Sequence, residues 1–216
     1  TGHHQVFSSA RMNALAAHAT ALFLGGSAQY WIAKHNEHHA HPNHEEMDPD
    51  VDVLILAFSE QQARAKTGLA RWIVARQQWF FFPILSLVCV SLRASSIEYV
   101  LKHPFKKTWP DILIMIAHVS LYAGIVFTAL PLAMGIVFIL IHQLLFGLYM
   151  GSVFAPNHKG MMMVTADTKI DFLREQVLTA RNIKAHPLTD FLYGGLNYQV
   201  EHHLFPHMPR NQLRFA

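Results

Sequence analysis

The sequence has few charged residues and almost no cysteine. Charged residues make up 14% of the 216 residues, whereas hydrophobic residues make up 52%. Soluble globular proteins carry about a quarter charged residues, so this balance favours a membrane protein. The single cysteine, Cys89, lies in an apolar run. The chain therefore cannot form an internal disulfide or a metal site built on several cysteines.

A strong charge of one sign is also missing. The formal net charge is +3, and the basic residues are dispersed along the chain. Without an arginine-rich patch or a nucleic-acid-binding motif, we expect no nucleic-acid partner. The weak basic excess fits a surface that faces anionic lipid headgroups or acidic cofactors. The chain also starts and stops abruptly, and we expect it to be part of a longer protein.

Two long apolar runs predict a transmembrane helical hairpin. They cover residues 112–130 and 132–155, and each is long enough to cross a bilayer, which takes about 20 residues. Lys106 and Lys107 precede the first run, Lys159 follows the second, and no charged residue lies between the runs. Because basic residues accumulate on the cytoplasmic side, we expect both ends of the hairpin there.

Three further segments are expected at the membrane surface. Residues 79–92 form an apolar run of about 14 residues, which is short for a span, and its opening aromatic residues suit the membrane interface. Residues 168–186 have the pattern of a surface amphipathic helix. Residues 12–32 are moderately apolar. If the histidines before and after the hairpin bind one centre, they lie on the same side of the membrane, and residues 79–92 should not cross it. If His3 also joins that centre, residues 12–32 should not cross the membrane either.

Histidine is abundant, with 16 residues against 14 for aspartate and glutamate together. Two clusters stand out, His35–His39 (HNEHH) and Gln199–His203 (QVEHH). On a helix the first, fourth and fifth residues of each cluster share one face. Adjacent histidines on such a face have little packing purpose, and imidazole is a common metal ligand. The spacing therefore predicts metal binding by the histidines of both clusters.

Other histidines carry weaker signals. His158 follows the second apolar run, and its spacing alone suits a helix cap as well as a ligand. Isolated histidines within apolar runs, such as His118 and His142, more often make ordinary hydrogen bonds. Ligating histidines usually donate their second nitrogen to an acceptor, and Asp48, Asp50 and Glu201 are available for this. One tetrahedral ion takes at most four ligands, so the number of candidate imidazoles favours two metal ions.

At these residues the sequence resembles the membrane fatty acid desaturase family. His35–His39 resembles the second histidine box of that family. Gln199–Pro206 (QVEHHLFP) resembles the third box in its glutamine-led form, typical of front-end, delta-5/delta-6-like members. Gly2–Gln5 resembles the tail of the first box, whose leading histidine would lie before this chain. The pair Asn157-His158 matches an isolated additional ligand of the family.

The resemblance implies an all-α integral membrane protein, in which the hairpin and interfacial helices carry a cytosolic cap with the histidine boxes. Residues 1–216 would form one membrane domain, truncated within the first box and at the C-terminus. The implied metal ligands are His3, His35, His38, His39, His158, His202 and His203. The residues expected to support these ligands are Gln199, Asn157, Asp48 and Glu201.

The implied activity is O2-dependent desaturation of an acyl chain at two iron ions. The substrate would be an acyl-lipid or acyl-CoA, and electrons would come from cytochrome b5 or a ferredoxin with its reductase. The membrane would be the endoplasmic reticulum or a bacterial plasma membrane. A tunnel for the acyl chain is expected beside the hairpin. Phe146, Tyr149, Met150 and Phe154 are available to line it, although packing between helices is the more common role of such residues.

Two other functions are compatible with these residues. A hydroxylase or ketolase on the same scaffold would insert oxygen instead of forming a double bond. A histidine-rich metal transporter is more remote, because transport requires polar or ionisable residues along the spans. The hairpin offers only His118 and His142 for that purpose.

Overall fold

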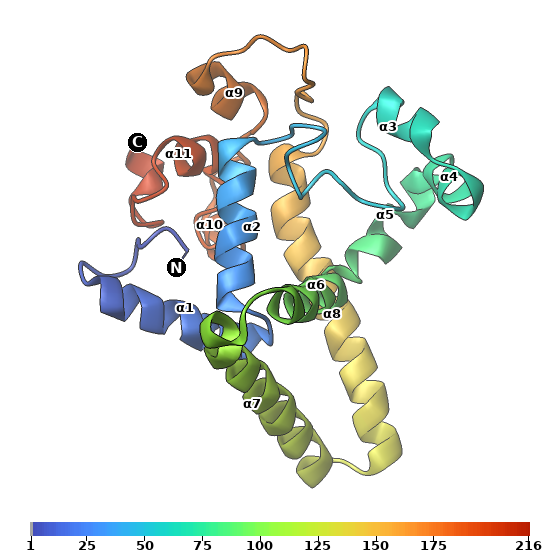
Figure 1. Ribbon diagram of the computed structural model, residues 1–216, viewed down its shortest axis with the longest axis vertical. Helices are drawn as coiled ribbons and strands as arrows, with labels where there is room; N and C mark the ends of the chain where they lie inside the picture. The colour runs from blue at the N-terminus through green and yellow to red at the C-terminus, as the bar shows by residue number, and fades with distance from the viewer. Residues whose placement is uncertain (1) are drawn as a thin grey trace. The chain divides into compact units, whose positions relative to one another are not determined.

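The computed structural model describes residues 2–216, and all regular elements within them are helical (Figure 1). The expected all-α class is confirmed. The helices are α1 (Ala10–Leu24), α2 (Ala28–Ala40), α3 (Glu60–Ala65), α4 (Gly68–Val74), α5 (Gln77–Leu85), α6 (Val88–Lys102), α7 (Phe105–Ala129), α8 (Leu132–His158), α9 (Phe172–Leu178), α10 (Pro187–Tyr193) and α11 (Gln199–Leu204), followed by the short 3-10 helix η1 (Leu213–Phe215).

The chain divides into two compact units. The first contains the residues up to 33 together with 85–150, and the second contains 34–84 and 151–216. The first unit therefore holds α1, α6, α7 and most of α8, whereas the second holds the histidine clusters and the short helices around them.

The helices α7 and α8 form the predicted hairpin. Both are long and apolar enough to cross a membrane, with a mean hydropathy of 2.1 in their most apolar windows. Only 6% and 11% of these windows are buried within the protein, so their apolar side chains are available to lipid. Leu130 and Pro131 connect the two helices. The spans predicted at 112–130 and 132–155 lie almost entirely within these helices.

A sharp break separates α1 from α2 in the first unit. Gly25 ends α1 with φ at 74°, in the left-handed region that favours glycine. Asp111 of α7 then holds the start of α2. Its buried carboxylate accepts hydrogen bonds from Ser27 Oγ at 2.5 Å and from the backbone N–H of Gln29 at 3.2 Å. Residues 12–32 are therefore two helices and not a single straight span.

The histidines of the hairpin make ordinary hydrogen bonds. The His118 ring lies 2.8 Å from the carbonyl oxygen of Leu22, and the His142 ring lies 2.7 Å from the hydroxyl of Tyr122. These contacts tie α7 to the end of α1 and to α8. They agree with the structural role expected for isolated histidines in apolar runs.

The apolar run 79–92 is divided between two helices, since α5 ends at Leu85 and α6 begins at Val88. Together α5 and α6 meet the requirements for a membrane span only as a bent pair. The expectation that this run lies at the interface and does not cross stays a prediction. The side chain of Trp79 is 76% exposed, which suits an anchor at a membrane surface.

The expectation of one amphipathic helix over residues 168–186 is wrong. Only α9 is helical there, and its start is capped by Asp171, whose carboxylate accepts from the Arg174 amide at 3.1 Å. After α9 the chain is extended, because its amides bond to other segments of the second unit. The backbone N–H of Arg181 donates to the backbone carbonyl of Asn157 at 2.9 Å, and the backbone N–H of Ile183 donates to the backbone carbonyl of Asn197 at 2.8 Å.

Candidate metal centre

Three buried histidines of the second unit, each on a different helix, meet at one point. His38 comes from α2, His158 from the end of α8 and His203 from α11. The Nε2 atom of His158 lies 3.3 Å from Nε2 of His38 and 3.2 Å from Nε2 of His203. We call these three side chains the inner histidine group.

In each ring of the inner group, the second nitrogen, Nδ1, lies next to a hydrogen-bond acceptor. His38 Nδ1 lies 2.9 Å from Asp48 Oδ2, His158 Nδ1 lies 3.0 Å from the Thr179 carbonyl oxygen, and His203 Nδ1 lies 2.8 Å from Gln176 Oε1. An acceptor at Nδ1 fixes the ring proton there. The three Nε2 atoms then carry lone pairs in a neutral ring.

Burial disfavours a charged imidazole, and it is the main cause that lowers the pKa of His158 to about 3. Burial and the neighbouring imidazoles of His39, His158, His38 and His202 hold the pKa of His203 well below 6.5. Three lone pairs that face one another repel unless a cation lies between them. A metal ion bound tetrahedrally at 2.0–2.1 Å by imidazoles places neighbouring nitrogens about 3.3 Å apart. The observed spacing therefore fits a metal ion.

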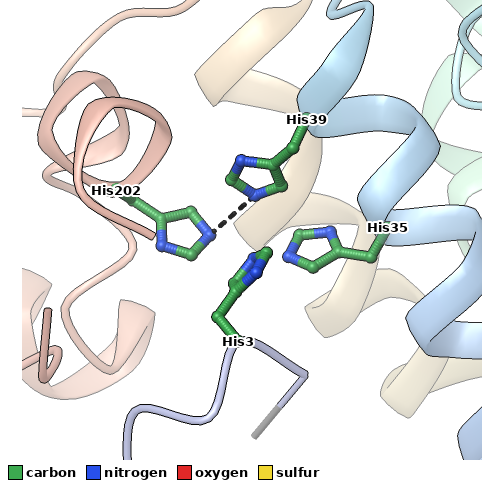
Figure 2. A group of neighbouring side chains, drawn as sticks. All are labelled: His3, His35, His39 and His202. Carbon is green, nitrogen blue, oxygen red and sulfur yellow. Dashed lines mark hydrogen bonds between the residues drawn. The ribbon is translucent and has the colours of Figure 1, made fainter. Parts of the chain in front are cut away.

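A second group lies beside the first. The rings of His35, His39 and His202 point toward one another (Figure 2), and one nitrogen from each lies within 4.8 Å of the others. His39 Nε2 is 3.2 Å from His202 Nε2. The His39 ring also stacks on the ring of His203, with 4.2 Å between centroids, so this outer histidine group adjoins the inner one. Two adjacent groups suit two metal ions.

The three helices present these side chains for local reasons. On α2, positions 35, 38 and 39 share a face. On α8, the helix continues past Pro156 to His158 because its freed carbonyl groups find partners. The Tyr193 hydroxyl donates to the Ser152 carbonyl at 3.3 Å, and Arg181 Nε donates to the Pro156 carbonyl at 2.6 Å. On α11, His202 and His203 point to the outer and inner groups respectively.

The expected supporting residues have different contacts. Asp48 is buried, and its carboxylate accepts hydrogen bonds from the His38 ring and, at 2.7 Å, from the backbone N–H of Asn43. Burial alone would raise the pKa of its carboxyl, but these hydrogen bonds bring the pKa below 3.8. The Glu201 carboxylate accepts from Asn182 at 2.7 and 2.9 Å, and so holds α11 beside the extended segment after α9. Asp50 pairs with Lys34.

Sequence reasoning missed three residues that hold the inner group. Gln176 and the Thr179 carbonyl accept the ring protons of His203 and His158. Asn43 has a φ of 55°. Its side-chain nitrogen Nδ2 donates to the backbone carbonyls of His158, Met162 and Thr179 at 3.1–3.2 Å. The only signal in the sequence was an asparagine next to proline in the histidine-rich stretch, which is typical of a turn.

The remaining expected ligand, His3, belongs to the other unit. It lies on a turn that precedes α1, and its side chain is buried. Its participation in a metal centre stays a prediction.

Comparison with known proteins agrees with the histidine geometry. The family model described as "Fatty acid desaturase" matches residues 1–216. The chain belongs to the fatty acid desaturase family. The family resemblance inferred from the histidine boxes is thus confirmed.

Several curated relatives have similar sequences. An acyl-lipid (9-3)-desaturase of Physcomitrium patens is 31% identical over 98% of this chain and 42% of its own length. The delta(6)-fatty-acid desaturase fat-3 of Caenorhabditis elegans is 31% identical over 88% of this chain and 46% of its own length. The delta(8)-fatty-acid desaturase of Euglena gracilis is 29% identical, with 98% and 53% covered. The chain spans about half the length of the relatives it matches.

Proposed function

We propose that the chain is the catalytic part of a front-end fatty acyl desaturase, which introduces a double bond into an acyl chain with O2 as co-substrate. The observation that carries the proposal is the inner histidine group, in which three buried imidazoles direct their Nε2 atoms at one point. Membership of the fatty acid desaturase family supports iron as the metal.

The two histidine groups divide the ligands between two iron ions. His38, His158 and His203 would hold one ion. His35, His39 and His202, joined by His3, would hold the other. When bound, the iron pair would activate O2, which is the oxidant needed to remove hydrogen from an alkyl chain that has no acidic proton for acid–base catalysis.

The residues behind the ligands keep the rings ready to bind metal. Asp48, Gln176 and the Thr179 carbonyl hold the imidazole protons on Nδ1, so each Nε2 of the inner group stays unprotonated. Such partners orient ligand rings and strengthen metal binding. Because they are buried, they also exclude bulk water from the site.

An apolar pocket in the first unit supports binding of an acyl chain. It has a volume of about 100 Å³ and is formed by parts of α1, α2, α6 and α8. Phe146 and Met150 line it, as anticipated for a tunnel beside the hairpin, whereas Tyr149 and Phe154 are not among its lining residues. Ala17, Ala21 and Leu92 contribute further apolar surface. Methylene groups of a fatty acyl chain suit such walls.

The proposed setting follows from the same family. The substrate is an acyl-lipid or acyl-CoA, and the electron donor is cytochrome b5 or a ferredoxin with its reductase. The positive-inside rule supports a cytoplasmic active site, in the endoplasmic reticulum or a bacterial plasma membrane.

The test is expression of the protein in a host of defined lipid composition, followed by mass spectrometric mapping of double bonds. A new double bond that is absent with His203→Ala supports the proposal. An oxygenated chain would instead indicate the hydroxylase or ketolase alternative. Lipids that stay unchanged, with iron bound and an electron donor supplied, would contradict both. Iron analysis should give about two ions per chain, whereas zinc carried across vesicle membranes would indicate a transporter.

A further inference from the structure

Gln199 begins the cluster Gln199–His203 and lies against the inner histidine group. Its side chain is buried and joins two neighbours of the same unit. Gln199 Oε1 lies 2.9 Å from Asn157 Nδ2, and Gln199 Nε2 lies 2.9 Å from His158 Nε2. Which end of this amide faces the group decides its chemistry, because the carbonyl oxygen can bind a metal ion and the NH2 group cannot.

A backbone carbonyl fixes the orientation. Asn157 Nδ2 lies 3.0 Å from the carbonyl oxygen of Leu196, which can only accept a hydrogen bond. Asn157 must therefore present its NH2 group at this position. The Gln199 atom that contacts the same nitrogen must then be the oxygen. The opposite end of the Gln199 amide, the NH2 group, consequently faces His158.

His158 independently agrees with this orientation. Its Nδ1 atom faces the Thr179 carbonyl and therefore carries the ring proton. Its Nε2 atom is an acceptor, and Gln199 donates to it. This is the same lone pair that points into the inner histidine group. When a metal ion takes that lone pair, the Gln199 N–H group loses its acceptor while it remains buried, and a buried donor without an acceptor is unfavourable.

From these contacts we propose that Gln199 is a positioning hydrogen-bond donor and not a metal ligand. Asn157 holds its amide so that one N–H group points into the inner histidine group, where it binds a small anionic or oxygen-containing ligand placed beside the metal. Asn157 thus decides the chemistry of Gln199. The inference rests on the metal centre of the proposed function.

The first test uses Co²⁺ as a spectroscopic probe in the chain reconstituted into lipid nanodiscs. We compare wild type with Gln199→Leu, which removes both ends of the amide. A positioning donor predicts that cobalt affinity stays within about threefold and that the ligand-field bands are unchanged. Azide affinity should fall at least about 10-fold, as expected for a lost hydrogen bond to a charged group.

The second test reverses the amide. In Asn157→Asp the group that faces Gln199 can only accept, so Gln199 should turn its NH2 group toward residue 157 and its oxygen toward the metal. The ligand-field bands should then shift to those of a higher coordination number, and azide affinity should fall. The double variant Asn157→Asp/Gln199→Leu should lack the shift, because the added oxygen ligand is gone.

The outcomes separate the two levels of the proposal. Wild-type protein that binds no cobalt would overturn the metal centre, and with it this inference. If wild type binds cobalt but Gln199→Leu weakens cobalt binding 10-fold or more and alters the bands, Gln199 is a ligand and the inference alone fails. It also fails if azide affinity does not change in Gln199→Leu.

Discussion

Gln176 and His203 are joined by a buried hydrogen bond, with 2.8 Å between the amide oxygen of Gln176 and Nδ1 of His203. Neither side chain is more than 2% exposed. This bond connects α9 to α11 and fixes the proton of a proposed metal ligand. It therefore links the fold of a short surface helix to the chemistry of the centre.

Replacing Gln176 by leucine should weaken metal binding. Without its acceptor, the His203 ring loses its fixed orientation and its preferred tautomer, and we expect a 10- to 100-fold loss of affinity, as is typical for partners of ligand histidines. Metal titration in nanodiscs measures it. Gln61→Leu, at an exposed position on α3, is the control and should bind metal like wild type. Equal affinity of both variants would contradict the role of Gln176.

The metal-free protein should lose stability in acid through His203. Its pKa in the folded state lies well below 6.5, mainly because of burial, so below pH 6.5 the unfolded chain binds a proton that the folded chain does not. The free energy of unfolding is therefore not reduced by this group above pH 6.5. Below pH 6.5 it falls progressively, by up to about 1.4 kcal/mol per pH unit, because His203 becomes protonated only in the unfolded chain. Thermal unfolding followed by circular dichroism between pH 7 and pH 5 measures this loss.

His203→Gln should show a shallower loss of stability over the same pH range, because the buried titrating ring is gone. His103→Gln, at an exposed position, is the control and should follow wild type. A steep loss that persists in His203→Gln would assign the acid sensitivity to other groups.

Two glycines of the hairpin should respond in opposite ways to alanine. A Cβ at Gly147 would clash with the backbone oxygen of Ser86, whereas a Cβ at Gly124 would meet nothing within 4 Å. Gly147→Ala should therefore destabilise the protein by about 1–3 kcal/mol through overpacking. Gly124→Ala should be neutral or stabilising by up to about 1 kcal/mol, because alanine favours the helix. Unfolding in detergent titrations compares them, and equal stability would contradict the close approach at Gly147.

Asp111→Ala should loosen the junction between α1 and α2. The carboxylate of Asp111 is fully buried and accepts from Ser27 and Gln29. Its removal leaves these donors without their acceptor, which costs about 1–3 kcal/mol. Hydrogen exchange should increase at the first amides of α2. Asp52→Ala, at an exposed position, is the control, and similar exchange in both variants would contradict the prediction.

The hairpin could be predicted from the sequence because it depends on local composition. About 20 consecutive apolar residues suffice for a membrane span, and both α7 and α8 are long and apolar enough to be spans. The surface helix expected at 168–186 was wrong because its pattern ignored long-range partners. The carbonyls of Asn157 and Asn197 draw residues 181 and 183 into an extended segment, and neither partner is visible in a local pattern.

The sequence by itself determined which imidazoles are available, because helical spacing places 35, 38 and 39 on one face and 199, 202 and 203 on another. Only the tertiary structure decided how they are shared. His38 and His203 join His158, whereas His35 and His39 join His202. It also decided that Gln199 presents N–H and not oxygen to the inner group. The physical reason is that a hydrogen-bond acceptor sets the position of a ring proton and the orientation of a side-chain amide. Here the acceptors are the backbone carbonyls of Leu196 and Thr179 and the side chain of Gln176. The carbonyls have no sequence signature, and Gln176 lies far from His203 in sequence.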